Sequence, residues 1–169
     1  MENAAYEQAA TLLKDRVHAY AAHILRDREE ARDVAQEALV RLWQNRVQVD
    51  RDGAKSWLMR TTHNLCIDRI RKRKIRGEVE GETVIAFRPD TAPGPARLSE
   101  SGEVGSRIQE ALGKLKPLDR AVVVMREIQG MNYDEIAKAL DLPLGTLKAR
   151  LHRARERLRN RLVQARVTP

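Results

Sequence analysis

Aromatic residues and cysteine are scarce in this chain. Phe, Trp and Tyr make up 4% of its 169 residues, so the core must be built mainly from Leu, Ala, Val and Ile. Cys66 is the single cysteine, which excludes an intrachain disulfide and fits a reducing compartment. Because it falls on an apolar helical stretch, we expect it to pack in the core rather than to act in redox chemistry. The low glycine content, with many Arg, Glu, Leu and Ala, predicts an all-α protein.

Long hydrophobic runs are also lacking. No stretch of about eighteen apolar residues occurs, which is the length that a membrane-spanning helix needs. The first residues, MENAAYEQ, do not have the basic-then-apolar pattern of a signal peptide. We therefore expect no membrane insertion and a cytoplasmic location.

Positive charge gathers in two separate places. The formal net charge is +8. Residues 68–76 (DRIRKRKIR) carry six basic side chains and one acidic, and residues 114–169 carry thirteen basic and six acidic. Residues 77–113 between them hold seven acidic and three basic side chains. This pattern predicts a polyanion held at two places. Nucleic acid fits better than a membrane surface, because the basic helices lack the Trp and Phe anchors of interfacial helices.

Helical periodicity divides the first half into three segments. Apolar side chains recur at helical spacing over residues 4–25. Asp27 stands three residues before Glu30, the spacing of a capping box, which predicts that a second helix starts there. After a polar break (QVDRDG), a third helix is expected over about residues 55–76. Three helices of this size make one small domain, residues 1–76.

Glycine and proline interrupt the pattern over residues 77–105, which we interpret as a flexible linker. Its acidity either keeps the chain soluble or imitates a nucleic-acid strand inside a basic channel, and composition leaves both open. Residues 106–169 then show four helical segments, over residues 108–115, 117–128, 132–140 and 143–162. The sequence thus predicts two small helical domains, joined by the linker.

The last two segments have the pattern of a helix-turn-helix. A short amphipathic helix is followed by a tight turn at 141–143 and by a basic helix with a leucine stripe. A solvated basic helix in a bundle is the alternative, but the charge, the turn and the capping residues together favour DNA binding. We expect the later arginines of this helix to hold phosphates, which give affinity without sequence information. The side chains expected to enter the major groove are Thr146, Lys148, Ala149, Arg150, His152 and Arg153.

The other basic run, residues 69–76, closes the predicted third helix. Cations there also complement the helix dipole, but six charges in eight residues exceed what the dipole needs. Just upstream, the amide of Asn64 offers both a donor and an acceptor to an unpaired base. The candidate DNA-binding residues of this basic run and the polar stretch before it are Arg60, Asn64, Asp68, Arg69, Arg71, Lys72, Arg73 and Lys74.

Three segments carry a family resemblance. DREEARDVAQEALVRLWQ, WLMRTTHNLCIDRIRKRK and DEIAKALDLPLGTLKARLHRARERLR, in this order, closely resemble extracytoplasmic-function (ECF) sigma factors of the sigma-70 family. The resemblance covers the chain apart from the linker. It implies that residues 1–76 are a region 2 that binds core RNA polymerase and melts the promoter. Residues 106–169 would be a region 4 whose helix-turn-helix binds the upstream promoter element.

The resemblance also implies roles for individual residues. Asn64 matches a position that helps to capture a flipped nontemplate base, and the helix from Lys148 to Arg153 matches the reading helix. Asp141 stands at a turn position where such motifs often carry Gly, and Asp tolerates the left-handed backbone better than most residues. Trp43 could as well be simple core packing. The residues that match the segment docking on the clamp helices of the largest polymerase subunit are Asp33, Val34, Gln36 and Glu37, and Leu42 and Trp43 would complete that surface or its support.

The expected function is therefore promoter-specific initiation of transcription, under the control of an anti-sigma factor. The partners would be core RNA polymerase, through its clamp helices and flap, and promoter DNA. The protein would be associated with the nucleoid when bound to polymerase. No catalytic residue, metal or cofactor is expected.

Two other functions compete with this one. A free-standing helix-turn-helix regulator would bind duplex DNA tightly without core polymerase. An enzyme acting on nucleic acid, such as a serine recombinase, is disfavoured because Ser56 is the only serine in the first half and no strand-rich catalytic core is expected.

Overall fold

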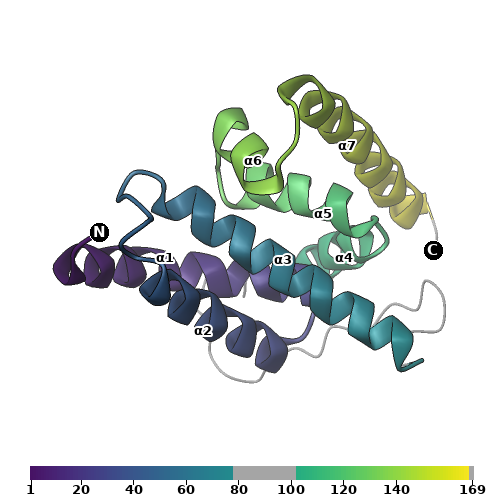
Figure 1. Ribbon diagram of the computed structural model, residues 1–169. Helices are drawn as coiled ribbons and strands as arrows, with labels where there is room; N and C mark the ends of the chain where they lie inside the picture. Colours follow the sequence, from purple (N-terminus) through teal and green to yellow (C-terminus); the bar gives the residue numbers. More distant parts are fainter. Residues whose placement is uncertain (78–101, 168–169) are drawn as a thin grey trace.

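The computed structural model describes residues 1–77 and 102–167, with side chains described through residue 165. No strand occurs among these residues, and the predicted all-α class is confirmed. Most of the predicted linker, residues 78–101, lies outside the described part, and with it the question of what its acidic residues do. The elements, drawn in Figure 1, are α1 (Asn3–Leu25), α2 (Arg28–Gln44), α3 (Ala54–Ile75), α4 (Gly102–Gly113), α5 (Pro117–Val123), the π-helical turn η2 (Val124–Ile128), α6 (Tyr133–Leu140) and α7 (Leu144–Val167).

Helices α1, α2 and α3 pack against one another around an aliphatic core. Tyr20, Leu42 and Leu58 contribute to it, each with 0–1% of its surface exposed. The predicted start of α2 is confirmed, because the Asp27 carboxylate accepts a hydrogen bond from the Glu30 N–H at 3.0 Å. Each of the three predicted helices is present, within two residues of its expected bounds.

The second half contains the predicted helix-turn-helix. Helix α6 begins with a complete capping box, in which Asn132 and Glu135 each bind the other's backbone N–H. It ends at Asp141, whose φ of 53° places it in the left-handed region, as the sequence predicts for this turn. The stripe of α7 is buried at Leu147 and Leu151, so the opposite side of this helix is free for other contacts.

Two boundaries differ from the sequence prediction. Residues 102–105 are the first turn of α4 rather than the end of the linker. The helix expected over 117–128 widens into a π-turn at Val124, where the Gln129 N–H donates to the Val124 carbonyl five residues back. Both differences are local, and the order of elements is unchanged.

The two halves pack against each other and share one cluster of buried apolar residues. Helix α6 runs along α3, and α5 meets α1 (Figure 1). Gln129 and Arg16 exchange two hydrogen bonds across this contact, and His23 meets Gln109 at 3.0–3.2 Å. The described halves therefore form one body.

A buried arginine joins them. The Arg120 guanidinium, 9% exposed, donates to the Ile24 carbonyl at the end of α1 at 2.7 Å. It also donates to three carbonyls around the end of α4, those of Leu112, Gly113 and Leu115, at 2.8–3.0 Å. Burial, together with the nearby Arg26, lowers the pKa of Arg120 to about 10, so the group is still charged at neutral pH. One cation thus satisfies the free carbonyls at two helix ends.

Arg26 lies beside this network in an unusual backbone conformation. Its φ is 56°, in the left-handed region that closes α1, and its own N–H donates to the Ala22 carbonyl at 2.8 Å. Its guanidinium lies against Gly113 so closely that a Cβ at that position would clash with it. The contact joins the end of α1 to the end of α4.

Candidate nucleic-acid interface

Helix α2 presents an acidic, partly apolar outer face. Asp33 and Gln36 are exposed, and Glu37 is half-buried and accepts a hydrogen bond from Arg41 at 2.6 Å. Val34 and Leu42 are 0% exposed, so they lie beneath this face and not on it. They lie on the inner side of the helix and support this face from beneath.

Trp43 is partly packed and partly exposed. It is 37% exposed, and its ring meets Tyr6 edge-on with centroids 4.9 Å apart. The guanidinium of Arg46 stacks over the same ring at 3.7 Å, a cation–π contact. The indole is thus held in place while one part of it remains on the surface, and Val40, one turn earlier in α2, is 52% exposed.

Helix α3 displays a polar edge in its first half. Arg60, Asn64 and Asp68 are exposed, so the geometry allows each of them to meet a ligand. The hydroxyls of Thr61 and Thr62 instead donate to backbone carbonyls four residues back, at 2.9 and 2.7 Å. The exposed polar edge of α3 therefore includes Arg60, Asn64 and Asp68 but not the hydroxyls of Thr61 and Thr62.

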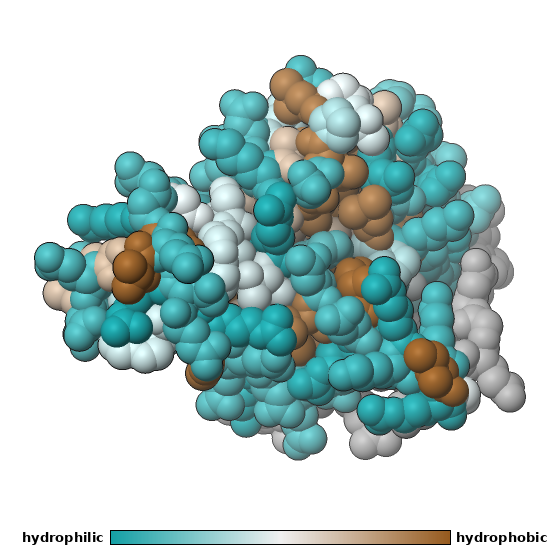
Figure 2. Space-filling view, viewed as in Figure 1, coloured by the Kyte–Doolittle hydropathy of each residue, from teal (hydrophilic) through white to brown (hydrophobic). Residues whose placement is uncertain are grey.

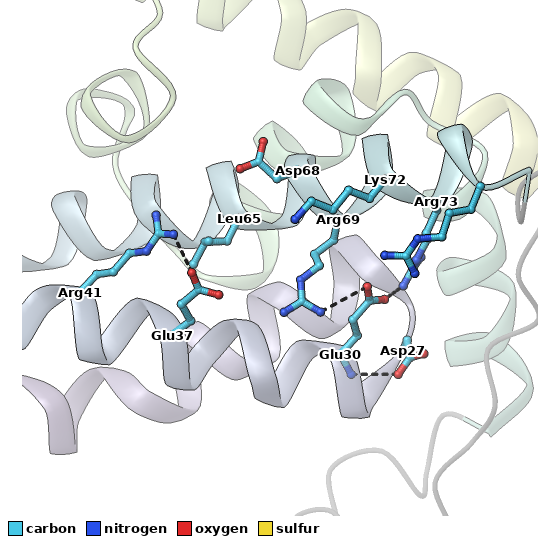
Figure 3. A pocket seen from close by; sticks show the side chains of 10 residues that line it. Asp27, Glu30, Glu37, Arg41, Leu65, Asp68, Arg69, Lys72 and Arg73 are labelled. Carbon is cyan, nitrogen blue, oxygen red and sulfur yellow. Dashed lines mark hydrogen bonds and ion pairs between the residues drawn. The ribbon is translucent and has the colours of Figure 1, made fainter.

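The basic run at the end of α3 divides into two groups. Arg71, Lys72 and Lys74 are exposed. Arg69 and Arg73 turn towards α2 and pair with Glu30, Arg69 at 3.7 Å (Figure 3). The Glu30 carboxylate thus faces α3, and at the start of α2 the hydrogen bond of the capping pattern is the one from the Glu30 N–H to the Asp27 carboxylate. These two arginines therefore join helices as well as adding positive potential.

A pocket of about 600 Å³ opens between α2 and the end of α3. It brings a carboxylate row from α2 next to cations from α3, as Figure 3 shows. The long side chains on its walls leave a polar groove between the acidic face of α2 and the basic run. Its lining residues are Asp27, Glu30, Glu37, Arg41, Leu65, Asp68, Arg69, Lys72, Arg73 and Arg76.

Helix α7 exposes most of the side chains that the sequence predicts to enter a major groove. Exposed side chains on its outer side include Thr146, Lys148, Ala149, His152 and Arg153. The Lys148 ammonium lies 5.7 Å from the centre of the Tyr133 ring, and His152 lies 3.5 Å from Glu156. These residues form a continuous solvent-facing edge that begins at the N-terminus of the helix, the part that enters a major groove in helix-turn-helix proteins.

Arg150 differs from the other predicted groove residues, because its side chain is only 28% exposed. It points inward and donates to Asp119 at 2.7 Å, while Arg157 donates to the other oxygen of the same carboxylate at 3.1 Å. The Asp119 side chain is only 7% exposed. This buried carboxylate ties α7 to α5, and sequence spacing alone gives no sign of it because Asp119 lies in a different helix.

His63 and Cys66 are buried, and burial shifts the pKa of each. The Tyr20 hydroxyl meets Nδ1 of His63 at 2.8 Å, and burial lowers the pKa of His63 to about 4. Burial raises the pKa of the Cys66 thiol to about 12, and the residue is 0% exposed. The expectation that Cys66 packs in the core is confirmed.

Comparison with known proteins now adds to this geometry. The family model of sigma-70 region 2 matches residues 10–75, and that of sigma-70 region 4 matches residues 106–158. The ECF RNA polymerase sigma factor SigW of Bacillus subtilis is 36% identical over 166 residues, covering 94% of this chain and 89% of the relative. This chain belongs to the ECF RNA polymerase sigma factors. The resemblance seen in the sequence is thereby confirmed.

Other relatives of this sigma factor differ in length. SigE of Mycolicibacterium smegmatis is 34% identical over 151 residues, and the match covers 89% of this chain but 58% of the relative. Among solved structures, the sigma factor RpoE of Bartonella quintana, in complex with the anti-sigma factor NepR, matches with a TM-score of 0.74 at 23% identity over 97% of this chain and 98% of its own. CnrH, in complex with the cytosolic domain of CnrY, matches with a TM-score of 0.70 at 25% identity over 97% and 90%. The fold is that of a two-region sigma factor.

The matched regions coincide with the surfaces described above. Region 2 contains the acidic face of α2 and the polar edge and basic run of α3, and region 4 contains the helix-turn-helix. No helix in residues 1–77 or 102–167 has the length and apolarity needed to cross a bilayer.

Proposed function

We propose that this sigma factor recruits core RNA polymerase to its promoters and opens them with two separate DNA-binding surfaces. The acidic face of α2 would bind the clamp helices of the largest polymerase subunit. The exposed edge of α3 would hold the melted nontemplate strand, and the outer side of α7 would read the upstream element. The main support is that the residues matched to regions 2 and 4 carry three chemically distinct exposed surfaces. One lies on α2, one on α3 and one on α7.

The action proposed is energetic and not covalent. Binding to polymerase would set the two DNA-binding surfaces at a fixed separation, so that two weak contacts act at high effective concentration. Capture of an unpaired base by Asn64, with phosphates held by Arg71, Lys72 and Lys74, would offset the few kcal/mol needed to unstack that base. We expect the protein to catalyse no reaction itself. We also propose that it acts in the cytoplasm, on the nucleoid.

Region 4 would also contact polymerase. Figure 2 shows a mainly hydrophilic face with apolar residues gathered over the part of the molecule where α5, α6 and α7 meet. Ile128 and Leu144 are 44% and 40% exposed. We propose that the polymerase flap binds region 4, and apolar side chains of this kind would contribute to that contact.

We also propose control by an anti-sigma factor. RpoE was solved with such a protein, NepR, and its fold is shared by this chain. A protein inhibitor would have to cover the acidic face of α2 to prevent docking on polymerase. Co-purification of the tagged chain from its own cells, with identification of the bound proteins, tests this proposal, and recovery of polymerase with no inhibitor under any growth condition would contradict it.

Binding to core polymerase tests the main proposal directly. We expect the purified chain to form a complex with bacterial core enzyme on size-exclusion chromatography, and Asp33→Lys to weaken it. The matched control is Glu7→Lys, the same charge reversal at an exposed position of α1. A wild-type chain that forms no complex, yet binds duplex DNA tightly by itself, would instead support the free-standing regulator.

A further inference from the structure

A single buried carboxylate holds two arginines of α7. Asp119, in the first turn of α5, accepts a hydrogen bond from Arg150 at 2.7 Å with one oxygen and from Arg157 at 3.1 Å with the other. The Asp119 side chain is 7% exposed, and α5 packs against α7 along this contact. Arg150 and Arg157 are about two helical turns apart, so they project from the same side of α7.

The inward position of Arg150 depends on this carboxylate. The Arg150 side chain is 28% exposed, and its Nε atom is buried with no hydrogen-bond partner among the described residues. Within those residues, the bond to Asp119 is the one hydrogen bond that the Arg150 guanidinium makes. Because a buried guanidinium without a partner is costly, Arg150 would turn to solvent if the carboxylate lost its charge.

Arg157 is held at the surface, next to the side of α7 that is expected to enter the major groove. Its side chain is 55% exposed, so loss of the bond to Asp119 frees it by a rotation of the side chain alone. The exposed residues Thr146 and Arg153 lie one turn before Arg150 and Arg157, respectively. The two arginines therefore border the groove-facing side, where long side chains can reach the phosphates along the groove.

Contacts to phosphates and contacts to bases have different effects on DNA binding. Phosphate contacts raise the affinity for every sequence alike, whereas contacts to base edges distinguish one sequence from another. Arg150 and Arg157, once released, would add contacts of the first kind. Lys148 and Arg153, which are exposed on the same helix, are available for the second kind.

We propose that Asp119 is a positioning residue that determines specificity. It holds Arg150 and Arg157 against α5, away from DNA phosphates, so that binding by α7 depends mainly on the side chains that reach bases. The inference rests on the proposed function and adds to it a device that favours selection of the promoter sequence. Asp119 itself touches no DNA, because its carboxylate is buried and both of its oxygens are occupied.

The first measurement is the salt dependence of nonspecific DNA binding by the full chain. The probe is a short fluorescein-labelled duplex of random sequence, followed by anisotropy at a series of NaCl concentrations. Each neutralised phosphate adds about 0.9 to the slope of log affinity against log salt. The variant Asp119→Asn keeps the size of the side chain and removes its charge. The matched control is Asp134→Asn, which removes one charge at an exposed position of α6.

We expect Asp119→Asn to steepen this slope by about 1–2, since it frees two arginines, and to bind the probe about three- to ten-fold more tightly at low salt. The control Asp134→Asn should have the slope of the wild type. Adding Arg157→Ala to Asp119→Asn should reduce the slope again by about 1. A residue that only stabilised the fold would give no such rescue, and far-UV circular dichroism checks that each variant is folded. Equal slopes of Asp119→Asn and Asp134→Asn would overturn the proposal.

Arg157→Ala alone gives a second test that leaves the buried carboxylate intact. Because Asp119 already holds Arg157, we expect this variant to have the slope of the wild type. A slope reduced by about 1 would mean that Arg157 already binds a phosphate, which would overturn the proposal.

Sequence selectivity is measured on the complex with core polymerase. A pool of duplexes randomised upstream of a fixed melted segment is bound once, and the bound fraction is sequenced. We expect the wild type to enrich a defined set of upstream sequences and Asp119→Asn to enrich the same set several-fold less. Equal enrichment by the two chains would show that Asp119 does not determine specificity.

These outcomes are separable from the fate of the proposed function. A chain that shows the expected salt slopes, but never binds core polymerase, would refute the proposed function and leave the role of Asp119 intact. A chain that binds polymerase through α2, with Asp119→Asn indistinguishable from its control, would refute the role of Asp119 alone.

Discussion

Replacement of Arg120 by methionine tests whether the buried guanidinium stabilises the closed body. Methionine has a similar length and no charge, so it fills the space without making the four hydrogen bonds to the carbonyls of Ile24, Leu112, Gly113 and Leu115. Those carbonyls belong to the backbone, so no second substitution can remove them. Arg120→Met therefore leaves acceptors of two helix ends without their donor.

The expected magnitude follows from two opposing effects. Each hydrogen bond from a charged donor is worth about 1.5–3 kcal/mol, so four of them favour the folded state by roughly 6–12 kcal/mol. Removing a buried charge returns several kcal/mol of desolvation cost, and water satisfies some of the carbonyls that are left. We expect a net loss of about 3 kcal/mol in the free energy of unfolding. In a chain of this length that lowers the Tm by about 6–12 °C.

Urea unfolding followed by far-UV circular dichroism measures this loss, with thermal unfolding as a second readout. The matched control is Arg159→Met at an exposed position of α7, where we expect a change within about 0.5 kcal/mol. If Arg120→Met were as stable as this control, the carbonyl network would contribute nothing net. The account of how the halves hold together would then be wrong.

Two further predictions concern pH and the reading helix. Burial lowers the pKa of His63 from 6.5 to about 4, so between these pH values the unfolded chain binds more protons than the folded one. We therefore expect the free energy of unfolding to fall by up to about 3 kcal/mol as pH is lowered from about 6.5 to about 4. His63→Asn, which keeps an acceptor for the Tyr20 hydroxyl, should show a shallower fall in urea titrations at successive pH values, and an unchanged slope would contradict this origin. On α7, Arg153→Ala should weaken duplex binding by about 1–3 kcal/mol and relax specificity at the base pair that it reads, without loss of stability. Arg150→Ala should instead lower the urea midpoint, because Asp119 loses one of its two partners, and the reverse result for this pair would refute the assignment.

Local chemistry made much of the second half predictable. Asn132 and Glu135 have the spacing of a capping box, and both hydrogen bonds are present. Asp141 was expected in a left-handed turn because few other residues tolerate one, and the structure has it there. These features depend on residues within a few positions of one another, and such interactions are visible in a sequence.

Long-range contacts explain what the sequence did not reveal. Arg150 lies on the solvent side of the leucine stripe by spacing, and only the buried carboxylate of Asp119, in another helix, turns it inward. Val34 and Leu42 belong to the core side of α2, although the segment that contains them matches a docking surface. The closing of the two halves depends on Arg120 and Ile24, which are far apart in the chain, so no local pattern marks the contact.

The contact between Arg26 and Gly113 restricts how this chain can vary. A Cβ at position 113 would meet the far end of the Arg26 side chain, so a substitution there requires the guanidinium to move or position 26 to carry a smaller residue. The left-handed backbone at position 26 makes glycine or asparagine the simplest replacements. Among related sigma factors, a larger residue at position 113 should therefore accompany a smaller residue at position 26 or an arginine whose guanidinium lies elsewhere.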